Sequence, residues 1–256
     1  MKTLSLLILL FFFTVLNLAN ASPYSIQWVD MSATPNNGVV SSGTIYNLAG
    51  YGNVRVTHTT FLNPTRVQGV SGFHSGSITN GSNSYAWNSI DQLFLLNGDV
   101  GDSAVSYSVT FEFMNGLMPG GEGVLGIWGL GRTDLAYTNR ISTATVNKNG
   151  TFLGDFDLGT SRGASSVTDN AGNFIVKNSL PGDLTPGNPS FNSDLAIIRI
   201  DDGVTSITIN MVHIGQDGLA FNVGQITPVQ VPEPNIGILF IVAIVFGIAK
   251  FLYNKR

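Results

Sequence analysis

Alternation of apolar and polar residues constrains the fold of this chain more than any other feature of its sequence. In residues 105–113, Val, Tyr, Val, Phe and Phe alternate with Ser, Ser, Thr and Glu. A period of two places the apolar side chains on one face of a β-strand, whereas a helix repeats about every 3.6 residues. The same alternation recurs in 207–211, and Leu219, Phe221 and Val223 follow at a spacing of two beyond the turn 215–218. We therefore predict an all-β domain, with 132–141 as the best candidate for one short helix.

Turn residues divide the rest of the central region into short strands. Asp201-Asp202-Gly203 lies between the apolar segments 195–200 and 204–214, and Asp-Gly is typical of a tight hairpin. Strands of this number and spacing predict a single β-sandwich, jelly-roll or immunoglobulin-like, over residues 22–224. Further candidate strands are 25–29, 39–45, 54–59, 92–96, 124–130 and 174–177.

Composition excludes several classes of protein. The chain has no cysteine, which excludes a disulfide framework, a thiol nucleophile and a Cys-ligated metal. Residues 22–230 contain eight Lys and Arg against fifteen Asp and Glu, a net charge of −7. An acidic body with so few cationic side chains argues against nucleic acid as a partner.

The first 21 residues have the pattern of a signal peptide. Lys2 precedes an apolar run over 4–16, and Ala19-Asn20-Ala21 offers the small residues that signal peptidase accepts. We predict cleavage between Ala21 and Ser22 and export of the rest of the chain. The alternative is a retained signal anchor, and the polar sequence that follows Ala21 at once argues against it.

Residues 236–256 have the pattern of a transmembrane helix with a basic tail. Every residue in 236–249 is apolar or glycine. Extended to Tyr253, the segment covers about 27 Å at about 1.5 Å per residue, close to a hydrocarbon core of about 30 Å. The ammonium group of Lys250 would then snorkel to the interface, and Lys250, Lys255 and Arg256 would mark the cytoplasmic side. The alternative is a buried core helix.

A proline motif, Val231-Pro232-Glu233-Pro234, lies in a predicted tether over 225–235. Prolines fix φ and remove N–H donors, which keeps such a segment extended and unpaired. The motif, the apolar span and the basic end together resemble the PEP-CTERM sorting signal of Gram-negative bacteria. Members of that family commonly end in a tight arginine cluster, whereas Lys250 here stands apart from Lys255-Arg256.

The resemblance implies a membrane transpeptidase of the exosortase family, which recognises the motif and processes the chain near it. The protein would be the substrate of that enzyme and would do no such chemistry itself. Its body would be held outside the inner membrane by the anchor and would then reach the cell surface or the extracellular matrix. The alternative is a rigid proline spacer that needs no enzyme.

One segment formally matches a catalytic motif. Residues 159–163, with Ser161 at the centre, have the G-x-S-x-G pattern, and Asp201 and His213 follow in the order of an α/β-hydrolase. That mechanism needs a strand-to-helix turn above a parallel sheet, and the sequence indicates no crossover helices. The other histidines, His58 and His74, are not spaced as metal ligands. We therefore expect no enzyme and no cofactor.

Two kinds of residue remain as binding candidates. Aromatic rings could stack on a sugar, and the candidates are Tyr85 and Trp87, because the Asn, Ser and Gly residues of 80–88 favour an exposed Trp87; Trp128, between glycines, is expected to be buried. Turn aspartates could supply oxygen ligands to calcium, although they usually cap their own backbone. These aspartates are Asp99, Asp102, Asp201 and Asp202.

The sequence thus predicts an exported, non-catalytic protein of the cell surface or extracellular matrix. Its expected partners are signal peptidase and an exosortase-type membrane transpeptidase. One alternative is a carbohydrate-binding module that acts on exopolysaccharide, a material with which PEP-CTERM proteins are associated. The other alternative is a polysaccharide-active hydrolase.

Overall fold

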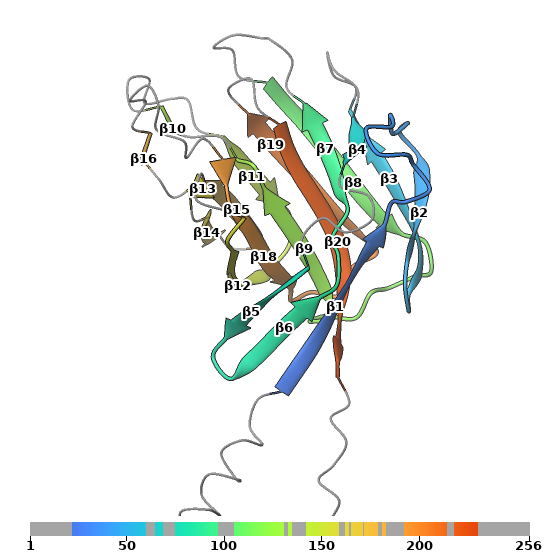
Figure 1. Ribbon diagram of the computed structural model, residues 1–256, viewed down its shortest axis with the longest axis vertical. Helices are drawn as coiled ribbons and strands as arrows, with labels where there is room; N and C mark the ends of the chain where they lie inside the picture. The colour runs from blue at the N-terminus through green and yellow to red at the C-terminus, as the bar shows by residue number, and fades with distance from the viewer. Residues whose placement is uncertain are drawn as a thin grey trace, which may run out of the picture.

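A computed structural model describes the central part of the chain, and its regular structure there is entirely β (Figure 1). The described residues are 22–59, 65–68, 75–96, 105–130, 133–134, 142–158, 162–163, 165–170, 172–178, 181–182, 192–213 and 218–229. The first ten strands are β1 (Ser22–Asp30), β2 (Thr44–Leu48), β3 (Gly52–His58), β4 (Arg66–Gln68), β5 (Gly76–Asn80), β6 (Asn83–Trp87), β7 (Gln92–Leu96), β8 (Val105–Phe113), β9 (Gly123–Trp128) and β10 (Thr133–Asp134). The others are β11 (Thr143–Val146), β12 (Gly150–Phe156), β13 (Arg162–Gly163), β14 (Ser165–Asn170), β15 (Asn173–Asn178), β16 (Pro181–Gly182), β17 (Asn192–Ser193), β18 (Leu195–Ile200), β19 (Ser206–His213) and β20 (Gly218–Pro228).

The prediction of an all-β domain is confirmed. Strands β7, β8 and β18 have the predicted bounds. Strand β2 begins only at Thr44, because the expected start of that strand is a loop whose Val39 bridges to Arg66. Of the helix candidate 132–141, only 133–134 are described, and they form strand β10. No helix among the described residues is long and apolar enough to cross a membrane, and the predicted span 236–253 lies outside them.

One continuous sheet of 16 strands replaces the two separate sheets that a sandwich prediction implies. Its main path runs β12-β18-β9-β20-β1-β2-β3-β8-β19-β11-β15-β14. Strand β1 lies in the middle of this path, because residues 24–28 pair with β20 and residues 29–30 pair with β2. We call β12, β18, β9 and β20 the first half of the sheet, and the strands from β2 to β14 on this path the second half.

The two halves share one hydrophobic core. Phe221 and Ile198 of the first half and Phe111 and Phe174 of the second half all belong to it and are fully buried. A second cluster contains Trp28, Trp87, Trp128 and Ile78. Strands of the first half contribute to both clusters and are therefore buried on both faces, which explains why β9 and β18 are almost continuously apolar instead of alternating.

Two predictions are wrong, one about a hairpin turn and one about the end of the domain. Asp201-Asp202-Gly203 does not close a hairpin, because β18 pairs with β9 and β12 while β19 pairs with β8 and β11. The turn instead carries the chain from the first half to the second. Strand β20 runs to Pro228 and not to 224, because residues 225–228 continue to pair with β1 and Ile226 is buried. The tether therefore begins later than predicted.

The two ends of the described domain lie side by side. Tyr24 pairs with Pro228, and the Val229 amide donates a hydrogen bond to the Pro23 carbonyl at 2.9 Å. Figure 1 shows the start of β1 and the end of β20 together at the bottom of the molecule. The first and last strands of the domain are thus direct neighbours.

Candidate functional site

A groove of about 380 Å³ lies against β1, at the point where that strand passes from one half of the sheet to the other. On its outer edge, β1 pairs in parallel with β6 over residues 22–25 and antiparallel with β2 over residues 29–30. Residues 26–28 pair with β20 on the inner edge but have no strand partner in these registers on the outer edge. The groove occupies this gap, between the end of β6 and the end of β2.

A buried polar network holds the backbone around the groove. Asn222 of β20 is fully buried, and its amide donates hydrogen bonds to the carbonyls of Val29 and Asp91 at 3.1 and 2.8 Å. The Asp91 carboxylate accepts a 2.7 Å hydrogen bond from the Met31 amide. The side-chain oxygen of Asn222, Oδ1, accepts a 2.7 Å hydrogen bond from the Val223 amide. These bonds satisfy backbone groups next to the point where β1 changes halves.

Polar groups line the rest of the groove. Asp30 is exposed and accepts a 2.8 Å hydrogen bond from the Ser32 amide. The side chain of Gln27 donates to Ser25 at 2.9 Å. Trp28 is only 7% exposed, and its indole N–H has no acceptor among the described residues. The groove therefore combines a rigid backbone with hydroxyl, amide and carboxylate groups.

The predicted sugar contacts, Tyr85 and Trp87, are not available as a surface platform. Trp87 is only 4% exposed and Tyr85 only 3%, so the expectation that Trp87 is exposed is wrong. Trp87 lies edge-on to Trp28 and Phe156, at centroid distances of 6.4 and 5.1 Å, and Tyr85 stacks on Tyr24. The physical reason is the β5–β6 hairpin, which turns these rings into the second cluster. Trp128 is buried as predicted.

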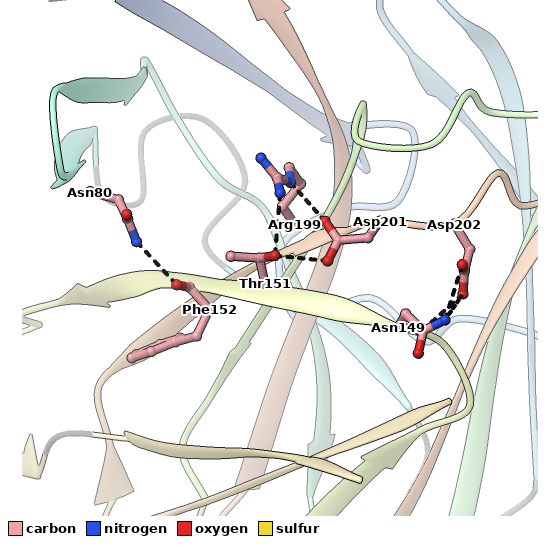
Figure 2. Close-up of polar contacts among 7 residues, drawn as sticks. All are labelled: Asn80, Asn149, Thr151, Phe152, Arg199, Asp201 and Asp202. Carbon is pink, nitrogen blue, oxygen red and sulfur yellow. Dashed lines mark hydrogen bonds and ion pairs between the residues drawn. The ribbon is translucent and has the colours of Figure 1, made fainter. Parts of the chain in front are cut away.

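The calcium candidates Asp201 and Asp202 bind protein groups (Figure 2). Asp201 accepts hydrogen bonds from Arg199 at 2.9 Å and from the Thr151 hydroxyl at 2.7 Å. Asp202 accepts the backbone and side-chain N–H groups of Asn149 at 3.0–3.1 Å. These bonds lower the pKa of the Asp202 carboxyl, with a smaller contribution from the positive charge of Lys148. The Asp202 carboxylate therefore joins the β18–β19 turn to the β11–β12 turn, and the Asp201 carboxylate joins it to Thr151 of β12.

The other metal and catalytic candidates are only partly described. Asp99, Asp102, His74 and Ser161 lie outside the described residues, and the side chain of His213 is not described. His58 places its ring nitrogens 3.0 Å from the Val40 carbonyl and 3.1 Å from the Thr59 carbonyl, as a structural histidine in a sheet does. Within the described ranges, no three His, Asp or Glu side chains gather as a metal site.

The processing residues are also outside the described part, with one exception. Ala19, Ala21, the motif Val231–Pro234 and the basic residues Lys250, Lys255 and Arg256 are not described. Ser22, the predicted first residue after cleavage, begins β1.

The groove residues were missed by the sequence argument. One signal of them exists, because Asn222 interrupts the apolar run 219–223 and a polar residue in such a run is commonly a buried hydrogen-bonding group. Nothing comparable marks Asp30 or Asp91. No family model matches this chain, and no curated protein or solved structure matches it either.

Proposed function

We propose that this chain is an exported, non-catalytic protein of the bacterial cell surface or extracellular matrix, anchored and then sorted through its C-terminal segment. The observation that carries the proposal is the pairing of the two domain ends, in which the Val229 amide donates to the Pro23 carbonyl. The predicted signal peptide precedes Ser22, and the predicted sorting signal follows Val229. Both apolar segments can therefore occupy one membrane while the domain lies on one side of it.

The length of the tether supports the same arrangement. Only residues 230–235 separate the last described residue from the predicted span. Six residues cover at most about 20–22 Å when fully extended. The proline motif would therefore stand in a short extended strip between the end of β20 and the membrane, within reach of a membrane-embedded exosortase-type transpeptidase. Signal peptidase would act at the other end of the domain, before Ser22.

A non-catalytic role is supported by the bonds of the candidate acid. In the hydrolase interpretation, Asp201 would orient His213, yet its carboxylate bonds to Arg199 and Thr151. The two halves of the sheet would correspond to the two layers of the jelly-roll kind of sandwich, followed by a membrane helix over 236–253. The body would be delivered to a Gram-negative cell surface.

The test compares the chain in a Gram-negative host with and without the host's exosortase gene. An epitope inserted in the exposed turn between Gly81 and Ser82 follows the body of the protein. In the complete host, we expect a body that lacks the C-terminal segment and leaves the inner membrane. In the deletion strain, a longer form should accumulate in the inner membrane fraction. The same size and location in both strains would contradict the proposal.

Variants of the motif provide the matched control. Pro232→Ala combined with Glu233→Ala should reproduce the deletion strain if the motif is recognised. Gln230→Ala changes the same tether outside the motif and should leave processing unchanged. Equal processing of both variants would support a plain spacer.

A further inference from the structure

We propose that the groove beside β1 binds a short stretch of a neutral oligosaccharide. The inference concerns the described domain alone and does not depend on how the chain is sorted or anchored. It also differs from a stacking site at Tyr85 and Trp87, which are buried.

The first step is the shape of the groove. Its floor is the outer edge of β1 at residues 26–28, where the registers with β6 and β2 leave a gap. The lining residues next to this gap are Asn88 and Ser89, which follow β6, and Ala49, which follows β2. The volume of about 380 Å³ is that of a small-ligand site.

The second step is the chemistry of the lining. Sugar hydroxyls both donate and accept hydrogen bonds, so they suit a wall that mixes donors and acceptors. Of the described residues that line the groove, none is Lys, Arg or His, and two are aspartates, so an anionic ligand is disfavoured. The polar side chains of the lining are Gln27, Asp30, Ser32, Asn88, Ser89 and Asp91.

The third step is preorganisation. Asp91 is 8% exposed and is fixed by the Met31 amide, while Asn222 fixes the carbonyls of Val29 and Asp91. Trp28, which lines the groove and is 93% buried, has an indole N–H with no acceptor in the described part of the chain. The indole nitrogen itself has no exposed surface, so the groove offers a ligand the exposed polar side chains of Gln27, Asn88 and Ser89. A rigid wall lowers the ordering cost of a polar ligand.

Two other occupants fit less well. A calcium ion needs six to eight oxygen ligands, and the lining contains only two carboxylates, Asp30 and Asp91, each already bonded to a backbone amide. A peptide strand would pair with the backbone of β1, but the gap offers only residues 26–28 before β6 and β2 close it. A hydroxyl-rich ligand does not need a long edge.

The experiment uses the full chain in a zwitterionic detergent, since detergents with sugar head groups would compete. The chain has three tryptophans, so its indole N–H groups give few signals in a ¹H–¹⁵N spectrum, and Trp28→Phe assigns that of Trp28. The probes are neutral hexasaccharides of glucose, mannose, galactose and N-acetylglucosamine, with hexagalacturonate and hexa-alanine as comparison ligands. We expect at least one neutral hexasaccharide to shift the Trp28 signal in a saturable way, and hexagalacturonate to bind at least tenfold more weakly.

Ser89→Phe fills the groove and should weaken binding at least tenfold. Ser82→Phe makes the same change at an exposed position in the β5–β6 turn and should leave binding unchanged. The proposal is overturned if no neutral hexasaccharide binds, if hexa-alanine alone binds, or if the two Phe variants weaken binding equally. The unfolding midpoint of Ser89→Phe is measured as well. If the midpoint is unchanged while the affinity falls, misfolding is excluded as the cause.

Discussion

Asn222 shows how a single residue stabilises the place where β1 changes halves. Its side chain satisfies the Val29 and Asp91 carbonyls and accepts the Val223 amide, all in a fully buried setting. Leucine has a similar size but cannot form these bonds, and each buried group left unpaired costs about 1–3 kcal/mol. We expect Asn222→Leu to lower the free energy of unfolding by roughly 2–4 kcal/mol, measured by urea unfolding followed by tryptophan fluorescence.

The control for this substitution is Asn210→Leu on β19. Asn210 is exposed, and its neighbours on the strand are already paired with β8 and β11. A surface change of this kind usually alters stability by less than about 0.5 kcal/mol. Equal losses for the two variants would show that the buried bonds of Asn222 contribute nothing particular.

Asp202 gives a prediction for pH. Hydrogen bonds from Asn149 lower the pKa of its carboxyl below the usual 3.8. A pKa that is lower in the folded state means that the ionised carboxylate stabilises the fold at pH values above about 3.8, and that this contribution disappears as the pH falls through the lowered value. We expect the difference in urea midpoint between the natural chain and Asp202→Asn to be constant near neutral pH and to close at acid pH. A difference that widens on acidification would contradict the assignment.

Among the elements, the β1–β20 pair depends on one small residue. A Cβ atom on Gly224 would lie against the Gln27 carbonyl oxygen, closer than van der Waals contact allows. Because the obstacle is backbone, β1 and β20 would have to separate. We expect Gly224→Ala to lower the free energy of unfolding by about 1–3 kcal/mol, while Gly203→Ala, whose Cβ would meet only the Leu117 side chain at 3.4 Å or more, should change it little. Similar losses for both variants would refute this account.

Among the described strands, β12 ends the path of the sheet, and two features hinder further pairing there. Asn80 of the β5–β6 hairpin donates its side-chain amide to the Phe152 carbonyl at 3.1 Å (Figure 2). The same amide donates to the Leu153 carbonyl at 3.1 Å. The register of β12 with β18 also shifts between Phe152 and Gly154. A bulge and a capped carbonyl both hinder pairing with another strand. The polar hairpin thus has a structural role that its composition did not suggest.

The strands of this fold were easier to predict than their partners. Alternation defined β8, and a continuous apolar run defined β18, because both patterns are local. The β5–β6 hairpin was missed because its apolar residues are few and its strands are rich in Asn and Ser, although Asn80-Gly81 is a turn signal and Gly81 has a φ of 59°. The pairing of β18 could not be predicted, since Asp-Gly is compatible with a hairpin and with a crossing between halves.

The groove could not be predicted from the sequence for the same reason. Its walls come from β1, from Ala49 and from residues 88–91, which are distant in sequence and meet only because β6 and β2 pair with the two ends of β1. The hydrogen bonds of Asp201 and Asp202 likewise depend on Thr151 and Asn149, which lie about fifty residues earlier in the chain. Local patterns carry no information about such long-range contacts.

At the scale of the whole molecule, the adjacency of the chain ends means that the domain closes only when its first and last strands meet. Strand β20 pairs with β1, β7 and β9, so it completes the first half of the sheet. During synthesis or export, β1 cannot form this pairing until residues 218–228 have emerged. The arrangement makes the fold a property of the complete domain, with a late and non-local closing step.

Circular permutation tests this arrangement. Because the Val229 amide lies 2.9 Å from the Pro23 carbonyl, about four Gly or Ser residues can join Val229 to Ser22. New ends between Gly81 and Ser82 would open the exposed turn between β5 and β6 and would cut neither strand. We expect this permutant to unfold cooperatively, with a free energy within about 1 kcal/mol of the linear segment 22–229, because the closed linker offsets the opened turn. A permutant opened between Asn222 and Val223, inside β20, should lose cooperative unfolding. If the first permutant failed as well, the ends of β1 and β20 could not be neighbours in solution. The proposed placement of the signal peptide and the sorting segment at one edge of the domain would then lose its geometric basis.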